Sequence, residues 1–338
     1  MDNASQEKIG ILLSNTGSPA SPDPDDVRAY LSKFLSDPRI RPMNMVAWWL
    51  ILHLFIFPKR GTTSGAKYAK IWTPAGSPFD VEHKALAELL EASYKGDGRN
   101  IEVRLGMSYG APFVADGLQA LRDAGCTRVI VLPLYPQGAF STSKAVADGV
   151  ARAMRKLRWD APVEVIDGYS DDERYLQAVT QTVRATDFNP NAGDKLLFNY
   201  HSIPMADIEA GDTYPQTVQE TSAAIASALS LADDAWAIGF NCQFDKGREW
   251  LKPFSRQHLS AWAHDGTTGR IFMVCPNFAT DCLETLYDID YELKPFYAEQ
   301  LTDAGADPQG REFIYIPCLN GTEAHANVLR SVLSRHVG

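Results

Sequence analysis

Short apolar runs alternate with segments of helical periodicity along the whole chain, and this alternation constrains its fold more than any other feature. The runs cover residues 9–15, 101–109, 128–134 and 163–167, and then 196–200, 236–240, 270–275 and 313–316. Strands without a polar face are buried on both sides, as they are in parallel sheets covered by helices. The sequence therefore predicts the α/β class, with doubly wound parallel sheets flanked by helices.

The same series of elements occurs twice. Helical patterns lie at 25–35, 81–94 and 143–158 in the first half, and at 215–231, 281–297 and 323–336 in the second. A polar turn from Gly168 to Asp172 lies between the halves and is typical of a boundary. The pattern predicts two similar Rossmann-like domains, 1–170 and 171–338, each with a parallel sheet flanked by helices.

The charge and the cysteines exclude several classes of protein. With 42 acidic and 32 basic residues, the net charge is −10, and no basic run offers the clustered cations that nucleic acids need. The five cysteines form no C-x-x-C pair, which argues against a zinc ribbon and fits a reducing compartment. Because the first ten residues have no apolar core, we expect no signal peptide and a cytoplasmic protein.

One segment is more apolar than a cytoplasmic protein normally exposes. Met45 to Phe57 has 13 residues, whereas a helix needs ~20 to span a bilayer. The pair Trp48 and Trp49, with Lys59 and Arg60 just beyond, favours a helix that lies in a membrane interface. A buried core helix is the alternative, because the segment is apolar all round. We expect residues 43–60 to form an apolar lip of the first domain.

Motifs for nucleotide cofactors are missing. The sequence has no G-x-G-x-x-G after its first strand, no P-loop and no G-x-S-x-G elbow, so we expect no nucleotide partner and no such nucleophile. In open α/β sheets the ligand still binds beyond the carboxyl ends of the strands. Those ends lie at 15–19, 108–112, 201–204 and 276–284.

A histidine and a row of carboxylates follow two of these strands. His201 comes directly before Ser-Ile-Pro, and Pro204 cannot continue the strand. An imidazole at a strand end can exchange protons at neutral pH or bind a divalent metal. A single histidine is nevertheless more often structural than functional.

Glu284, Asp288 and Glu292 are spaced by four, which places them on one face of a helix. Two structural explanations compete with a functional one. Asp281 and Glu284 fit a capping box, and the stripe could be an ordinary solvated face. In a water-filled cleft, the same carboxylates could relay a hard cation or protons.

These motifs resemble those of a known family. Asn199–Pro204, Asn-Tyr-His-Ser-Ile-Pro, resembles the histidine signature of the ferrochelatases, and Asp281–Leu286 resembles their glutamate signature. Further similar segments follow in order over nearly the whole chain, at 10–19, 68–78, 106–110, 132–137 and 211–215.

The resemblance implies a lyase that inserts Fe²⁺ into protoporphyrin IX, the last step of haem synthesis, by bending the macrocycle and abstracting its protons. It implies two Rossmann-like domains with a cleft between them, and a lip facing the membrane. The implied catalytic residues are His201, Glu284, Asp288 and Glu292, of which His201 and Glu284 would also meet the metal. The implied porphyrin contacts are Thr16, Arg60, Tyr68, Ser77, Tyr109 and Phe278.

Some residues depart from the family pattern. Cys242 replaces a serine, Cys282 stands where animal members have histidine, and the chain ends soon after Cys318 without the cysteine-rich tail of members with a [2Fe–2S] cluster. We therefore expect no cluster and no other cofactor, with porphyrin, ferrous iron and a membrane surface as partners. A cobalt or nickel chelatase, a coproporphyrin chelatase and a non-catalytic tetrapyrrole or metal carrier remain alternatives.

Overall fold

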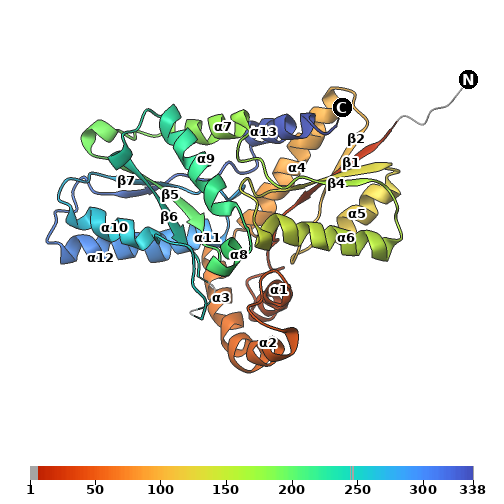
Figure 1. The fold of residues 1–338 in the computed structure, drawn as a ribbon, viewed down its shortest axis with the longest axis horizontal. Helices are drawn as coiled ribbons and strands as arrows, with labels where there is room; N and C mark the ends of the chain where they lie inside the picture. Colours follow the sequence, from red (N-terminus) through yellow and green to blue (C-terminus); the bar gives the residue numbers. More distant parts are fainter. Residues whose placement is uncertain (1–6, 244, 246, 338) are drawn as a thin grey trace, which may run out of the picture. The chain divides into compact units, whose positions relative to one another are not determined.

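A computed structural model describes residues 7–243, 245 and 247–337 of the chain. Residues 1–6, which form part of the segment examined for a signal peptide, lie outside the described residues, as do 244, 246 and 338. The chain divides into two compact units, residues 1–169 with 320–338, and residues 170–319. Each unit contains one four-stranded parallel sheet (Figure 1).

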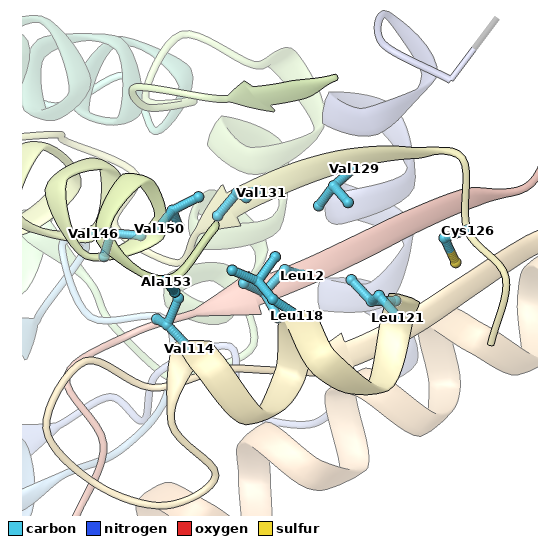
Figure 2. Packing of buried hydrophobic residues seen from close by; sticks show 10 residues of the cluster. All are labelled: Leu12, Val114, Leu118, Leu121, Cys126, Val129, Val131, Val146, Val150 and Ala153. Atoms are coloured by element: carbon cyan, nitrogen blue, oxygen red, sulfur yellow. The ribbon is translucent and has the colours of Figure 1, made fainter. Parts of the chain in front are cut away.

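The sheet of the first unit has the order β2-β1-β3-β4. Its strands are β1 (Ile9–Ser14), β2 (Ile101–Leu105), β3 (Arg128–Pro133) and β4 (Val163–Val165). The helices of this unit are α1 (Pro24–Ser36), α2 (Met45–Ile51), α3 (Phe57–Ile71), α4 (Pro78–Gly96), α5 (Val114–Asp123), α6 (Ala145–Leu157) and α13 (Glu323–Ser334), with π-helical turns η1 (Leu52–Ile56) and η2 (Phe140–Lys144). Leu12 of β1 and Val131 of β3 point toward Leu118 of α5 and Val150 of α6, where they form a buried apolar cluster (Figure 2).

The second unit repeats this arrangement, with strand order β6-β5-β7-β8. Its strands are β5 (Lys195–His201), β6 (Trp236–Asn241), β7 (Ile271–Val274) and β8 (Phe313–Tyr315). Its helices are α7 (Glu173–Arg184), α8 (Met205–Glu209), α9 (Tyr214–Ala228), α10 (Ser255–His264), α11 (Leu283–Tyr287) and α12 (Lys294–Asp303), with single turns η3 (Pro190–Ala192) and η4 (Asp233–Ala235) and the π-helical η5 (Asp288–Leu293). In Figure 1, α10 and α12 lie on one side of this sheet and α7 and α9 on the other.

This architecture confirms the predicted fold class. In each unit, numbering the strands along the chain gives the order 2-1-3-4, and every pairing is parallel. The central strands β1 and β7 are buried at every position, and β3 and β5 at all but their ends. Continuous apolar strands therefore lead to helices on both faces, as the sequence predicts.

The C-terminal segment corrects the predicted domain boundaries. The sequence pattern predicts a second domain of residues 171–338, but residues 320–338 belong to the first unit. There α13 packs against α4 and buries Leu329 and Leu333 completely. The helical periodicity of α13 predicts a buried face, but it does not identify the unit that the helix packs against.

The apolar lip is one continuous helical segment, α2, η1 and α3, packed on α1. Trp48 is 7% exposed and its indole N–H donates to the Leu35 carbonyl at 2.6 Å; Leu52 and Phe57 are buried as well. The opposite side is an exposed apolar patch formed by Val46, Trp49, Leu50, Leu54 and Phe55. One side of the segment is therefore buried, as the core-helix alternative requires, and the other side is exposed; Trp48 and Phe57 lie on the buried side.

Candidate active site

The strand order identifies the ligand-binding edge of the second unit. β5 leads to its neighbour β6 and β7 leads to its neighbour β8, so the connections that leave the carboxyl ends of β5 and β7 run in opposite directions. Such a switch point opens a crevice between the two central strands. His201 ends β5, and the loop after β7 leads to Glu284 in α11. Because the strands are parallel, both residues lie at the same edge of the sheet.

His201 is held so that one ring nitrogen is committed to the backbone. Its Nδ1 lies 2.6 Å from the Ser202 carbonyl oxygen, which can only accept, so Nδ1 carries the hydrogen. Nε2 of the neutral ring then keeps its lone pair. Burial lowers the pKa of His201, and the negative charge of Glu284 partly opposes that shift, so the neutral form is favoured and the two side chains interact electrostatically.

The turn before α11 leaves Glu284 out of the helix cap. The helix begins at Leu283, and the Cys282 N–H donates to the Thr285 hydroxyl at 2.9 Å. That hydroxyl in turn donates to Asp281 at 2.9 Å. The predicted capping box of Asp281 and Glu284 is therefore wrong. The half-buried Glu284 carboxylate accepts a hydrogen bond from the Cys282 thiol, whose pKa burial and this carboxylate raise.

The carboxylate stripe does not lie on a regular α-helix. α11 ends at Tyr287 and the chain continues as η5 from Asp288 to Leu293. A π-turn has more residues than an α-turn, which changes the angle between successive carboxylates, and such turns are common at functional sites. The continuous helix predicted over 281–297 is therefore corrected to three segments.

Asp288 and Glu292 have different partners. The Cys242 thiol, at the end of β6, donates to Asp288 Oδ2 at 3.5 Å, and burial together with the charges of Asp288 and Glu284 raises its pKa. Glu292 lies 3.9 Å from the Arg256 guanidinium in a partly exposed ion pair. The structure thus brings Glu284 and Asp288 near the half-buried Cys242 thiol, which the sequence marks only as a departure from the family pattern. The signal available was its position after β6, at the same sheet edge.

In the first unit, two predicted porphyrin contacts lie on paired loops. The Ser108 N–H donates to the Asn15 carbonyl at 2.8 Å and the Tyr109 N–H to the Thr16 carbonyl at 2.9 Å. Glycines permit this approach, because a Cβ at Gly17, where φ is +88°, would lie 2.6 Å from the Gly110 nitrogen. The Tyr109 hydroxyl donates to Asp37 at 3.1 Å and the side chain is buried, so Tyr109 supports the loop, whereas Thr16 is half-buried.

The other predicted porphyrin contacts occupy separate elements. Arg60 and Tyr68 lie on α3, with Arg60 half-buried and Tyr68 buried beside Trp72. Ser77 precedes α4 as its N-cap residue and is buried. Phe278 follows β7 in the second unit, where it packs partly buried against the apolar cluster below the site.

The side chains of the second-unit site are of types that can exchange protons or meet a cation. The site offers a neutral imidazole and two carboxylates. Across the residues that the structure describes, no group of three or more His, Cys, Asp or Glu side chains is arranged to hold a metal ion. A pair such as His201 and Glu284 can meet a cation in transit without forming a complete resident site.

Comparisons with known proteins agree with this geometry. The ferrochelatase of Azoarcus sp. is 40% identical over 94% of this chain and 85% of its own length. The ferrochelatase of Nitrosococcus oceani is 36% identical over 98% of this chain and 87% of its own. In fold, the chain is similar to a solved structure of SirB from Bacillus subtilis with Fe³⁺, with a TM-score of 0.55, 12% identity and 98% coverage of both chains.

The family assignment covers almost every described residue. The ferrochelatase family model matches residues 8–337, and the relatives are similar over most of their own length as well. The match includes both four-stranded sheets, His201 at the end of β5 and Glu284 in α11. On this evidence, the chain belongs to the ferrochelatase family.

Proposed function

We propose that this enzyme, a metal chelatase of the lyase class, inserts Fe²⁺ into protoporphyrin IX to form protohaem, the last step of haem synthesis. One observation carries the proposal beyond the family assignment. His201 and Glu284 follow the two central strands of one sheet and interact electrostatically at its ligand-binding edge. The exchange of two pyrrole protons for one divalent cation requires a base and an anionic group. The imidazole and the carboxylate supply them.

In this mechanism His201 accepts protons from the porphyrin. Insertion of Fe²⁺ releases two N–H protons from the macrocycle, which His201 would accept one after the other, passing each on through the neighbouring carboxylates to solvent. Because Nδ1–H donates to the Ser202 carbonyl, Nε2 is the basic atom, and burial lowers the pKa of the ring so that it begins the reaction unprotonated. Glu284 stabilises the imidazolium that forms, as a carboxylate beside a catalytic histidine does elsewhere.

The carboxylates provide the route for the metal or the protons. Hard divalent cations prefer oxygen ligands, and Glu284 and Asp288 are half-buried on successive turns of one helical segment. Glu292 continues the series on the partly exposed side, beside Arg256. We propose that their importance decreases from Glu284 to Glu292.

Other residues would hold and bend the macrocycle. We propose Thr16, Arg60 and Ser77 of the first unit, and Phe278 of the second, as porphyrin contacts. Tyr68 and Tyr109 are buried, which favours a supporting role for them. Bending a porphyrin exposes nitrogen lone pairs to the incoming metal, and binding energy from the periphery drives that distortion.

We propose that the apolar patch binds a membrane surface reversibly. Its side chains Val46, Leu54 and Phe55 are 76%, 63% and 69% exposed, which is uncommon for a contiguous surface of a monomer. The exposed Lys59 follows and would favour anionic lipid. Among the described residues, no helix is long and apolar enough to cross a bilayer.

A resident cofactor is not part of the proposal. The five cysteines include no C-x-x-C pair, the close spacing found in many cluster sites. Iron and acid-labile sulfide analysis of the purified protein tests this. Stoichiometric sulfide would contradict it.

Anaerobic incubation with Fe²⁺ and protoporphyrin, followed by absorbance, tests the function. We expect the free-base spectrum to convert to that of protohaem over many turnovers, and faster than with the four-carboxylate coproporphyrin. Preference for coproporphyrin, or for Co²⁺ or Ni²⁺ over Fe²⁺, would replace this proposal by the corresponding chelatase. Stoichiometric binding without turnover would indicate a carrier.

A further inference from the structure

A second histidine, remote in sequence from the first, is fully buried in the first unit. His83 lies on α4, 0% exposed, six residues after Ser77. Its Nδ1 is 2.7 Å from the Phe79 carbonyl oxygen one turn earlier. Its Nε2 is 3.1 Å from Nδ2 of Asn15, which follows β1. The ring therefore connects α4 to the loop after β1.

The partners of His83 specify its tautomer. A carbonyl oxygen can only accept, so Nδ1 must carry the hydrogen. Nε2 of the neutral ring then accepts from the Asn15 amide nitrogen, which is a donor. Burial lowers the pKa of His83 to about 4, so the ring stays neutral at physiological pH.

The Asn15 amide links the tautomer of His83 to the backbone of Thr16. Its Nδ2 donates to His83 and, at 3.4 Å, to the Leu134 carbonyl, while its Oδ1 accepts from the Thr16 N–H at 2.7 Å. With the amide reversed, Oδ1 would face the Leu134 carbonyl and the NH₂ group would face the Thr16 N–H. Only one orientation satisfies all three partners, and His83 in its Nδ1–H form selects it.

We propose that His83 is a positioning residue for porphyrin binding, because through the Asn15 amide it fixes the backbone that presents Thr16. The inference rests on the proposed function, in which Thr16 and Ser77 contact the porphyrin. His83 touches no substrate itself. It ties the helix that begins after Ser77 to the loop that contains Thr16, so both segments keep one geometry.

His83→Leu tests the proposal against a matched control, His325→Leu. His325 on α13 is 1% exposed, its Nδ1 lies 2.8 Å from the Asn320 carbonyl, and its pKa is also lowered to about 4 by burial. No bond from His325 to Asn15 is present among the described contacts. We expect His83→Leu to raise KM for protoporphyrin about tenfold with kcat within about twofold, as loss of one buried hydrogen-bond partner predicts.

The control and a double variant distinguish positioning from lost stability. His325→Leu should leave KM within about twofold while lowering the unfolding midpoint comparably. His83→Gln, which can both donate and accept, should have a KM close to the wild-type value. Asn15→Leu should raise KM by itself, and adding His83→Leu should add little, because both remove the same link. Equal KM effects of His83→Leu and His325→Leu would overturn the proposal.

The wild-type tautomer provides a readout that does not depend on any variant folding. Nitrogen-15 chemical shifts of His83 should show a neutral ring protonated at Nδ1 at pH 7. An Nε2–H tautomer would overturn the proposal, since the Asn15 amide would then be reversed. If wild-type protein fails to metallate any porphyrin, the proposed function fails instead, and the two failures are separate measurements.

Discussion

At the level of single residues, the hydrogen bond that Nδ1 of His201 makes leaves Nε2 as the basic nitrogen. With Nδ1–H committed to the Ser202 carbonyl, His201→Ala should lower kcat by about 10²–10⁴-fold, the usual contribution of a general base. The unfolding midpoint should change little because the ring is only half-buried. His258→Ala is the control, since His258 is a half-buried ring in the same unit that contacts the Ile238 carbonyl at 3.0 Å. Near-normal turnover by folded His201→Ala would contradict the assignment.

Variants of Glu284 and Thr285 should distinguish a catalytic role from a role in capping α11. Glu284→Gln keeps the shape but removes the charge, so we expect kcat to fall by at least about 10²-fold with unchanged stability. Thr285→Val removes the hydroxyl that accepts from the Cys282 N–H and should lower the free energy of unfolding by about 1 kcal/mol. Asp288→Asn and Glu292→Gln should have progressively smaller kinetic effects. A stability loss without a rate loss in Glu284→Gln would show that Glu284 is structural.

At the level of elements, the lip helix has one side in the core and one side exposed. Replacing Val46, Leu54 and Phe55 by Ser should reduce liposome binding and raise the apparent KM for membrane-borne protoporphyrin, with kcat and the unfolding midpoint little changed. Trp48→Ser is the contrasting variant. It removes a buried indole and its bond to Leu35, so it should cost about 3–5 kcal/mol of stability. Unaltered liposome binding by the triple variant would exclude the patch as a membrane contact.

The packing of α4 and α13 predicts a loss of stability in acid. His83 and His325 have pKa values lowered from 6.5 to about 4 by burial, so between these pH values the unfolded chain binds more protons. Their contribution is complete above pH 6.5 and decreases as the pH falls, by about 3 kcal/mol per histidine at pH 4.

A third titratable group, Asp80 on α4, has the opposite effect on stability as the pH falls. Burial raises the pKa of Asp80 from 3.8 to about 7, which favours the folded state as the pH falls, although partial exposure weakens the effect. Urea unfolding at pH 7 and pH 5 measures the net change. The double variant His83→Gln, His325→Gln should show a smaller loss between these pH values, and an identical loss would contradict the linkage.

At the level of the whole molecule, the first unit includes both ends of the described chain. α13 contributes four fully or almost fully buried side chains, Val328, Leu329, Val332 and Leu333. Removing residues 320–338 should therefore lower the stability of the first unit by at least about 6 kcal/mol, at about 1.5 kcal/mol per buried side chain. Thermal unfolding followed by circular dichroism measures this. An unchanged midpoint would show that the C-terminal helix is dispensable.

Local sequence patterns are sufficient to predict the fold class, the family and the strand ends near the candidate site. Apolar runs that lack a polar face require burial on both sides, and Pro204 places His201 at a strand terminus whatever the surroundings. These are local properties, and a chain expresses them within a few residues. The family motifs are equally local.

Contacts between distant segments settle what the sequence leaves open about the lip, the cap of α11, the partner of His83 and the placement of α13. Trp48 and Phe55 have the same apolar character in sequence, yet packing on α1 buries one and leaves the other exposed. Glu284 and Thr285 are adjacent candidates for the capping interaction, and the turn after β7 selects Thr285, which accepts from the Cys282 N–H. His83 meets Asn15 across 68 residues, and α13 returns to the first unit after the whole of the second. Such contacts depend on the free energy of burying distant surfaces together, which no local pattern encodes.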